Sequence, residues 1–374
     1  MNAAQDVILG VLGGPWCGFK YPGVEAYLIS IQRSGFTGRK VMLAWQIRSE
    51  VKQKLIEYGF EVVDIMPWPP EPFFHARMRL AWDYLKDHHK EFRFVFWLDV
   101  KDLILQSNPS VWMEQNIGNA KLIASSECVT IEQEETNQIW ARDILGEEKY
   151  REIKNDEVIN GGTWAGESEA MTEVFHQVHL GCNKYTGQYP PCQIWINYVM
   201  HTKPFVNMLR IPRWSEGFAA CLHPMWWSGA RAKCKPYLRD EPPVLNAETS
   251  ILYPGIKGEA KSKGVAFNDR WGKDVELRFL PADCNPLAGV GCVEIPSNKP
   301  FSIVHGYDRD WGLKAMFEFK YRFDGGYSLS SYKKYNSDVV AQLPQIKRLR
   351  RPVVQGIVSD SKLPQPPRVF VRST

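Results

Sequence analysis

The feature that most constrains the fold is the regular alternation of apolar runs and helix-like segments over the first hundred residues. The apolar runs lie at 6–12, 40–45, 60–65 and 92–98. The helix-like segments lie between them, at 23–34, 49–58 and 75–88. Strands that are apolar along their whole length and alternate with helices are typical of a parallel sheet buried on both faces. We therefore predict an α/β fold with a mostly parallel central sheet and helices on both faces.

The same alternation continues further along the chain and then fades. Two more strands are predicted at 121–125 and 158–166, and helices near 132–155 and at 168–180 and 192–201. From about 203 to 300 the chain is rich in Pro, Gly, Trp and Cys and has little periodicity. We predict that this irregular part forms loops and short strands over the ligand-binding cleft. A last strand is predicted at 301–305.

Composition argues against several classes of protein. A net charge of +4 over 374 residues is too small to indicate nucleic-acid binding by itself. No stretch approaches 18 consecutive apolar residues, and the start of the chain lacks the basic segment of a signal peptide. The eight cysteines include no CxxC pair, which argues against structural zinc, and no usable glycosylation sequon occurs. We therefore expect a cytoplasmic protein without a transmembrane segment.

Two acids directly follow the fourth apolar run. The stretch FRFVFWLDVKDLILQSNP places Asp99 and Asp102 where the strand at 92–98 ends. In parallel α/β sheets, ligands bind at the carboxyl ends of the strands. Two carboxylates there suit a divalent cation that also binds a diphosphate. Asp is equally typical of turns, where it accepts hydrogen bonds from backbone donors, so the acids alone leave both interpretations open.

The residues around these acids resemble a known family. The segment LDVKDLILQSNP is similar to the metal-binding strand end of nucleotide-sugar glycosyltransferases with the GT-A fold, where D-x-D is followed by apolar residues. Counted back from Pro109, the second Asp of that motif falls on Asp102 and the first on Val100. The resemblance therefore implies Asp102 as the main metal ligand. It implies Asp99, displaced by one position, as a second ligand or a contact to ribose.

Two later segments match the same family in the same order. Asn160, Gly161 and Gly162 resemble the N-x-G segment that approaches donor sugar and acceptor, although Asn-Gly is also an ordinary turn signal. The helix start PPCQIWINYVM resembles the D-Q-x-x-x-N of retaining transferases of the glycogenin and lipopolysaccharide galactosyltransferase type. Gln193 is kept there, whereas Cys192 replaces the Asp. The resemblance implies Gln193 and Asn160 as catalytic residues.

A late histidine and several basic residues complete the resemblance. His305 follows the last predicted strand, and two Asp with one His form a ligand set that suits Mn²⁺, with Mg²⁺ as the alternative. A lone histidine after a strand is otherwise usually structural. Contacts to the donor are expected from Gly13, Arg77, Asp99, Gly161, Gly162, Arg309 and Lys314. Arg77 and Arg79 are also compatible with an ordinary solvated helix face.

The implied activity is transfer of a hexose from a nucleotide diphosphate sugar, a UDP-sugar, to a hydroxyl group of a glycan or glycoconjugate acceptor. The glycogenin-type segments imply retention of anomeric configuration. An inverting reaction would need a carboxylate base, for which Glu167, Glu216 and Asp240 are open options. In either case the metal would stabilise the departing diphosphate.

Other functions remain compatible with the sequence. An aromatic content of 13%, with Trp214, Trp226 and Trp227 in the irregular part, also suits a non-catalytic carbohydrate-binding protein or a simple aromatic core. A sugar-nucleotide nucleotidyltransferase would carry a basic, glycine-rich phosphate loop after the first strand, and VLGGPWCGFKYPG lacks the basic residues. A phosphatase would place its acids after the first strand, which here ends in Gly-Gly.

The domain organisation follows from the same resemblance. We expect one GT-A domain over 1–330, with a nucleotide-binding half at 1–110 and an acceptor-binding half at 111–330. The remaining segment, 331–374, is a basic, Pro-containing tail with KRLRRP at 347–352. Such a tail is usually a solvated arm, and peripheral contact with an acidic membrane surface is the alternative.

Overall fold

The fold was analysed in a computed structural model. The described residues are 3–13, 24–187, 189–222, 239–240, 244–246, 251–254, 265–268, 274–280, 300–307 and 317–321. Contacts divide the chain into two units, Met1–Leu329 and Ser330–Thr374. All described residues belong to the first unit. The expected tail therefore lies outside the described residues.

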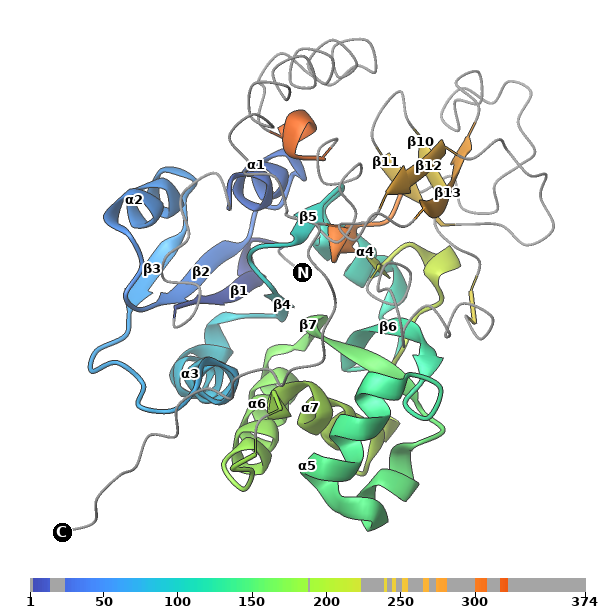
Figure 1. The fold of residues 1–374 in the computed structure, drawn as a ribbon. Helices are drawn as coiled ribbons and strands as arrows, with labels where there is room; N and C mark the ends of the chain where they lie inside the picture. Colours follow the sequence, from blue (N-terminus) through green and yellow to red (C-terminus); the bar gives the residue numbers. More distant parts are fainter. Residues whose placement is uncertain are drawn as a thin grey trace, which may run out of the picture. The chain divides into compact units, whose positions relative to one another are not determined.

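A seven-stranded sheet forms the centre of the first unit (Figure 1). In spatial order its strands are β3 (Glu61–Asp64), β2 (Arg39–Ala44), β1 (Val7–Leu12), β4 (Phe94–Leu98), β7 (Glu157–Glu167), β6 (Leu122–Thr130) and β8 (Leu209–Arg210). Neighbouring strands are parallel from β3 to β4, and β8 is parallel to β6. Only β7 runs against its two neighbours. The prediction of a mostly parallel central sheet is confirmed.

Strand β1 marks the point where the strand order reverses. The chain passes from β1 to β2 on one side, whereas β4 joins β1 on the other side, with Val7 opposite both Arg39 and Val95. The carboxyl ends of β1 and β4 therefore lie beside each other. In α/β folds such a reversal leaves a crevice at the carboxyl ends of the two strands, which is where ligands bind.

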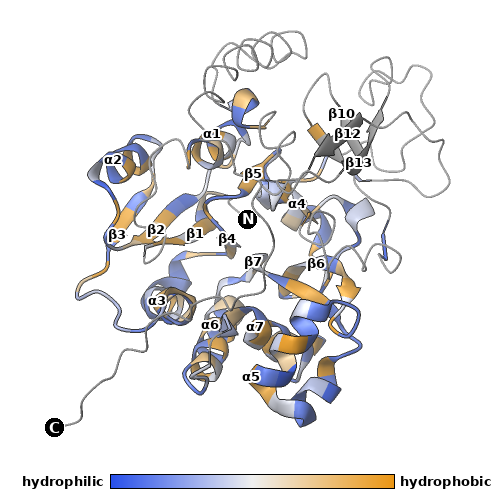
Figure 2. Ribbon diagram, viewed as in Figure 1, coloured by the Kyte–Doolittle hydropathy of each residue, from blue (hydrophilic) through white to orange (hydrophobic). Residues whose placement is uncertain are grey.

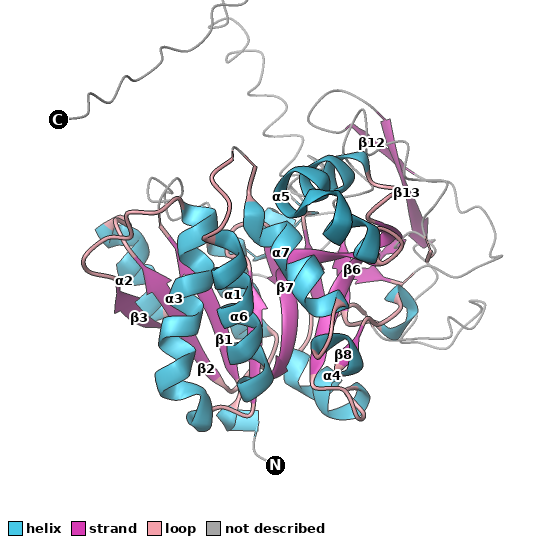
Figure 3. Cartoon of the chain, turned by 90° about the horizontal axis from the view of Figure 1, so that it is seen from below, coloured by secondary structure: helices cyan, strands magenta, loops and turns pink. Residues whose placement is uncertain are grey.

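Helices cover both faces of the sheet, as predicted. They are α1 (Glu25–Arg33), α2 (Ser49–Glu57), α3 (Phe73–His88), α4 (Pro109–Asn116), α5 (Glu135–Ile153), α6 (Ser168–Cys182) and α7 (Pro191–His201). Along β1, Val7 and Leu9 pack in the same core as α3, α6 and α7, whereas Ile8 packs with α1, α2 and α4. This alternation is the two-residue period of a strand. Figure 3 shows α3, α6 and α7 side by side across one face.

The helices are amphipathic to different degrees. In Figure 2, β1 has mainly hydrophobic residues, whereas α2 has mainly hydrophilic ones and buries only Val51 and Leu55. Helix α7, in contrast, buries most of its length, including Ile194 and Ile196. The burial of α7 brings its first turn against β7, close to the carboxyl edge of β4.

Two smaller sheets lie in the later part of the chain. One joins β5 (Leu103–Leu105), β14 (Ile303–His305) and β9 (Ala219–Cys221). The other contains β11 (Ile251–Tyr253), β10 (Val244–Asn246), β13 (Asp274–Leu280) and β12 (Val265–Asn268). Short 3-10 helices occur at Ala3–Gln5, His89–Glu91, Phe205–Asn207 and Trp214–Glu216. Short strands were predicted for the region 203–300. Whether this region covers a cleft stays a prediction.

None of the helices in the described part of the chain combines the length and the hydrophobicity that a membrane span requires.

Candidate active site

Three potential metal ligands converge at the carboxyl end of β4. Asp99 and Asp102 follow this strand, and His305 ends β14, about two hundred residues later. One oxygen or nitrogen atom from each of the three lies within 4.8 Å of the others. Nε2 of His305 is 3.3 Å from Oδ1 of Asp102 and 3.9 Å from Oδ2 of Asp99. We call these three residues the strand-end site.

The small sheet of β5, β14 and β9 brings His305 to the acids. Strand β5 begins directly after Asp102, and it pairs with β14 so that His305 lies opposite Leu103. The backbone N–H of Gly306 donates a hydrogen bond to the carbonyl of Asp102, with 2.8 Å between nitrogen and oxygen. On the other side β9 pairs with β14. Backbone pairing on both sides therefore fixes the position of the histidine.

The strand-end site is more buried at one side than at the other. Asp102 and His305 are buried, whereas the side chain of Asp99 is about one-third exposed. Burial by itself would lower the pKa of His305, but the carboxylate of Asp102 outweighs this effect and holds the pKa well above its usual range. Two carboxylates and an imidazole therefore converge, and the site is accessible to solvent on the side of Asp99. This donor set fits Mn²⁺.

Glycine is required beside this point. A Cβ atom on Gly162 would lie 2.2 Å from Oδ2 of Asp99 and 2.6 Å from Cε1 of His305. The backbone of Gly162 also accepts a hydrogen bond from the N–H of Asp99, at 2.8 Å. The sequence-based expectation was that this glycine makes room for a ligand. The structure shows that it makes room for the strand-end site itself.

Arg77 is buried next to Asp99 and does not lie on a solvated face of its helix. It is 6% exposed on α3, and its Nη1 donates to Oδ1 of Asp99 at 3.1 Å. Its Nη2 donates to the carbonyl of Gly161 at 3.4 Å. The guanidinium group therefore links the first acid to β7. Arg79, by contrast, forms ion pairs with Glu71 and Asp83 on the partly exposed side of the helix.

The side-chain amides of α7 and β7 hold the backbone next to the site. Oε1 of Gln193 accepts from the N–H of Gly161 at 2.7 Å, and its Nε2 donates to the carbonyl of Ile159 at 2.9 Å. Asn197, one turn later, bonds both the N–H and the carbonyl of Ile159. Oδ1 of Asn160 accepts from the N–H of Gly162 at 2.9 Å. These contacts place Gln193 and Asn160 next to the acids.

Cys192 lies in the first turn of α7, directly before Gln193. It is buried, and burial raises the pKa of its thiol in spite of the neighbouring Arg77. The thiol is therefore neutral at physiological pH and is not an anionic substitute for a carboxylate.

Gly13 lies at the carboxyl end of β1, next to β4. A Cβ atom there would lie 2.3 Å from the ring of Trp45, so this position also has to be glycine. The observed neighbour is thus an aromatic side chain. A contact of Gly13 with a donor stays a prediction.

Several predicted residues cannot be placed in the site. Arg309, Lys314, Trp226 and Trp227 lie outside the described residues. Trp214 is 2% exposed, so it fills the core and offers no open face for sugar stacking.

Two residues of the site were not predicted from the sequence. Oγ1 of Thr163 lies 2.8 Å from Nδ1 of His305, and Oε1 of Glu127 accepts from Nδ2 of Asn160 at 3.1 Å. Both side chains are buried. Glu127 had no clear signal in the sequence, because it lies in the part of β6 beyond the strand predicted at 121–125. Thr163 had none beyond its place directly after Asn-Gly-Gly.

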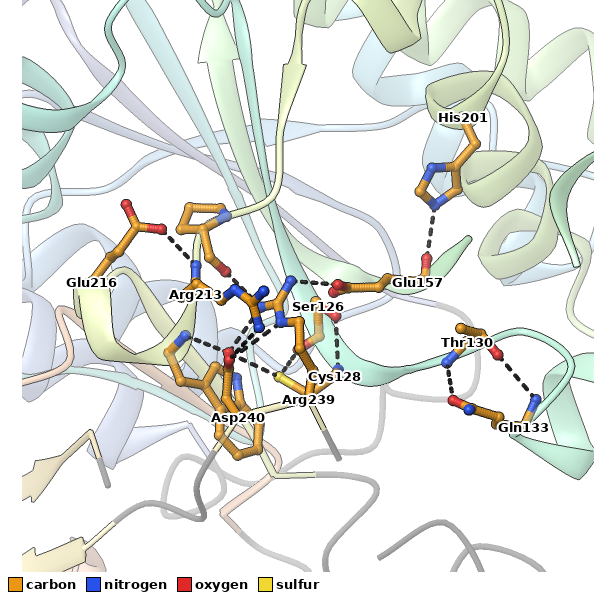
Figure 4. Close-up of polar contacts among 12 residues, drawn as sticks. Ser126, Cys128, Thr130, Gln133, Glu157, His201, Arg213, Glu216, Arg239 and Asp240 are labelled. Atoms are coloured by element: carbon orange, nitrogen blue, oxygen red, sulfur yellow. Dashed lines mark hydrogen bonds and ion pairs between the residues drawn. The ribbon is translucent and has the colours of Figure 1, made fainter. Parts of the chain in front are cut away.

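A second polar cluster lies where β7 begins (Figure 4). It contains three arginines and three acids: Arg210, Arg213, Arg239, Glu157, Glu216 and Asp240. Arg239 pairs with Glu157 and Asp240, Arg213 with Asp240, and Arg210 with Glu216. We call it the arginine cluster.

The three acids considered as bases from the sequence all have cationic neighbours. Glu216 and Asp240 belong to the arginine cluster. Asp240 also accepts from the N–H of Trp214 at 2.7 Å. Glu167, at the far end of β7, lies 3.4 Å from the ammonium group of Lys121. Burial by itself would raise the pKa of Asp240, but hydrogen bonds from Arg239 and Trp214 outweigh it and lower the pKa. A low pKa makes a carboxylate a weak base.

Comparison with known proteins yields only remote likenesses. No protein-family model matches the sequence, and no curated protein matches it. A solved structure described as the WbbM bifunctional glycosyltransferase is similar at 12% identity, with a TM-score of 0.41 over 59% of this chain and 40% of that chain. Glucosyl-3-phosphoglycerate synthase from Mycobacterium tuberculosis, in complex with UDP, is similar at 13% identity, with a TM-score of 0.36 over 55% and 68%. The match thus spans less than half of the WbbM chain. At these TM-scores the likeness carries no weight for the activity of this chain.

Proposed function

We propose that this chain is a metal-dependent glycosyltransferase of the GT-A type. It transfers a hexose from a UDP-sugar to a hydroxyl group of a glycan or glycoconjugate, with retention of anomeric configuration. The observation that carries this proposal is the convergence of Asp99, Asp102 and His305 beside the point where the strand order reverses. Metal-dependent hydrolysis of a UDP-sugar in the absence of acceptor would exclude a sugar-binding protein without catalysis.

The metal in this proposal is Mn²⁺, with Mg²⁺ as the alternative, held by the three residues of the strand-end site. When bound, it supplies positive charge that offsets the negative charge of a departing diphosphate. Asp102 and His305 are buried and form the fixed part of the ligand set. Asp99 is the more exposed ligand, and Arg77 fixes the direction of its carboxylate.

The residues of β7 and α7 form the subsite for the transferred sugar in this proposal. Gly161 and Gly162 bring the backbone close to the acids, and Gln193 and Asn160 hold that backbone in place. In this proposal the four residues act by holding the backbone that surrounds the anomeric carbon of the sugar in a fixed position. In a retaining reaction in which the acceptor attacks from the side of the leaving group, no enzyme base is required.

Should the reaction invert instead, the favoured base is Glu127. It is the described carboxylate that bonds directly to Asn160, whereas Glu216 and Asp240 are held by arginines. The anomeric proton of the first product in an NMR time course decides between the two outcomes. A product with retained configuration supports the proposed sugar subsite on β7 and α7. A product with inverted configuration indicates that Glu127 acts as the catalytic base.

The remaining assignments extend the same proposal. Residues 1–110 form the nucleotide-binding half and residues 111–330 the acceptor-binding half. The proposal places the protein in the cytoplasm and does not require the basic segment 331–374 to bind a membrane, although contact with an acidic membrane surface stays the alternative. Gly13, Arg309 and Lys314 are proposed contacts to the donor.

A screen of nucleotide sugars by thermal unfolding tests the proposal directly. A ligand that binds only the folded state raises the unfolding temperature, and the stabilisation grows with the logarithm of the ligand concentration divided by its Kd. We expect a rise with a UDP-sugar that is larger in the presence of Mn²⁺. Asp102→Asn should lose the additional rise in unfolding temperature that Mn²⁺ causes. The matched control, Asp87→Asn at an exposed position of α3, should keep it. No shift with any nucleotide sugar would overturn the proposal.

A further inference from the structure

The imidazole ring of His305 has close neighbours on several sides, and the thiol of Cys221 is one of them. Nε2 faces Asp102 and Asp99, Cε1 lies against the backbone of Gly162, and Nδ1 lies 2.8 Å from Oγ1 of Thr163. Thr163 and His305 are both buried, at 0% and 2% exposed. The hydroxyl therefore meets the ring away from water, and which of the two groups donates the hydrogen bond depends on the tautomer of the ring.

The two ring nitrogens have different tasks. A nitrogen that binds a metal does so through its lone pair and carries no proton. Nε2 is the nitrogen that faces the carboxylates, so in the metal-bound state Nδ1 carries the proton of the neutral ring. Its N–H then donates a hydrogen bond to Oγ1 of Thr163. We propose that Thr163 is a positioning residue for the metal site, which selects the Nδ1–H tautomer of His305 and leaves Nε2 as the ligand atom. This inference rests on the proposed metal site.

The opposite hydrogen bond would have the opposite effect. If the hydroxyl of Thr163 donated to Nδ1, the neutral ring would carry its proton on Nε2, between the imidazole and the acids. That proton would occupy the position of the cation. Partners of a ligating histidine commonly fix its tautomer and ring orientation in this way, and their loss typically lowers metal affinity 10- to 100-fold.

Thr163 is well suited to a fixed position. It lies inside β7, opposite Leu98 at the end of β4, and its carbonyl accepts a hydrogen bond from the hydroxyl of Ser125 at 2.6 Å. Its branched Cβ restricts the rotation of the side chain. The hydroxyl is therefore held by the central sheet, whereas the ring that it meets comes from β14. Thr163 ties a residue of the small sheet to the central sheet at the metal site.

The test compares Thr163→Val with Thr163→Ser. Valine has nearly the same shape without an acceptor, and serine keeps the hydroxyl. Binding of Mn²⁺ alone, measured by electron paramagnetic resonance, should weaken 10- to 100-fold in Thr163→Val and stay close to wild type in Thr163→Ser. Thermal unfolding without metal identifies a variant that fails to fold. Equal Mn²⁺ affinity in all three proteins would overturn the inference.

A second measurement needs no variant. Nitrogen-15 NMR of the wild-type protein with Zn²⁺, which is diamagnetic, reports which ring nitrogen of His305 carries the proton. We expect a proton on Nδ1 and metal on Nε2, and the reverse assignment would overturn the inference even if Thr163→Val is unstable. Failure of the wild-type protein to bind either metal would instead refute the proposed metal site, so the two failures are distinguishable.

Discussion

The strand-end site and the arginine cluster are built from similar side chains, yet their charges are balanced differently. In the arginine cluster three carboxylates meet three guanidinium groups. In the strand-end site the carboxylates of Asp99 and Asp102 meet one imidazole, and the one guanidinium that the described residues bring to them contacts Asp99 only. In the strand-end site one of the positive groups is thus an imidazolium, which can lose its proton and bind a metal, whereas a guanidinium group keeps its charge.

The strand-end site and the arginine cluster should therefore have different roles, the first in metal binding and the second in stabilising the fold. Carboxylates whose positive neighbour is a histidine can bind a divalent ion once the imidazole has lost its proton. Buried carboxylates that are paired one to one hold parts of the chain together, and removal of one partner leaves an uncompensated charge. Converging acids thus indicate a metal site when one of their positive partners can give up its proton, as His305 can. Variants in the two clusters should accordingly affect different measurements.

The largest expected effect is that of Asp102→Asn on metal binding. Loss of the buried carboxylate removes a direct ligand, so Mn²⁺ affinity should fall by more than about 100-fold, beyond what the loss of an outer partner causes. Asp240→Asn, in the arginine cluster, is the matched control and should leave Mn²⁺ affinity unchanged. Calorimetric titration measures both. An equal loss of Mn²⁺ affinity in the two variants would contradict the assignment of metal binding to the strand-end site.

The second effect concerns stability. Arg239→Met removes the guanidinium group between Glu157 and Asp240, and loss of these partly buried ion pairs should cost about 2 kcal/mol of unfolding free energy, between the values for exposed and for buried pairs. Arg151→Met is the matched control, because Arg151 pairs with Glu147 on an exposed face and such pairs contribute at most about 1 kcal/mol. Urea denaturation gives both values. A stable Arg239→Met variant with weakened Mn²⁺ binding would reverse the roles that we assign to the two clusters.

The sequence predicts the strand-end site better than the arginine cluster, and the reason is physical. Apolar runs of strand length identify β1 to β4, and parallel strands end at one edge, so Asp99 and Asp102 are placed by local pattern alone. The contact between His305 and Thr163 spans 142 residues and depends on the register of β14, which no local pattern encodes. The pairing of Arg239 with Glu157 spans 82 residues and likewise depends on tertiary packing.

Some local features were also missed. Helix α4 was not predicted, although Asn108 accepts from the N–H of Ser110 and Pro109 occupies the first turn, which is a standard helix start. The strand predicted at 121–125 continues as β6 to Thr130 through two irregularities of register. Such bulges re-aim side chains. The segment beyond the predicted strand is the one that carries Glu127, so the missed residue and the missed part of the strand have the same cause.

A smaller effect is expected from Gly162→Ala in the strand-end site. The new methyl group would approach Oδ2 of Asp99 and Cε1 of His305 to 2.2 and 2.6 Å, so the ligands must move apart. We expect Mn²⁺ affinity to fall about tenfold, as for the loss of an outer partner. Gly161→Ala is the matched variant, because its methyl group would meet Gln193 instead, and it should disturb Mn²⁺ binding less. An unchanged affinity in Gly162→Ala would mean that β7 yields easily at this point.

The smallest effect is the contribution of Asp240, in the arginine cluster, to the dependence of stability on pH. Because hydrogen bonds from Arg239 and Trp214 lower the pKa of Asp240 in the folded protein, the unfolded chain binds a proton here before the folded one does. Stability from Asp240 is therefore complete above the ordinary carboxyl pKa of about 3.9 and is lost as the pH falls through the lower folded value. Urea denaturation of metal-free protein between about pH 3 and 5 should show a shallower dependence for Asp240→Asn than for wild type. An equal slope would assign the acid sensitivity of the fold to other carboxylates.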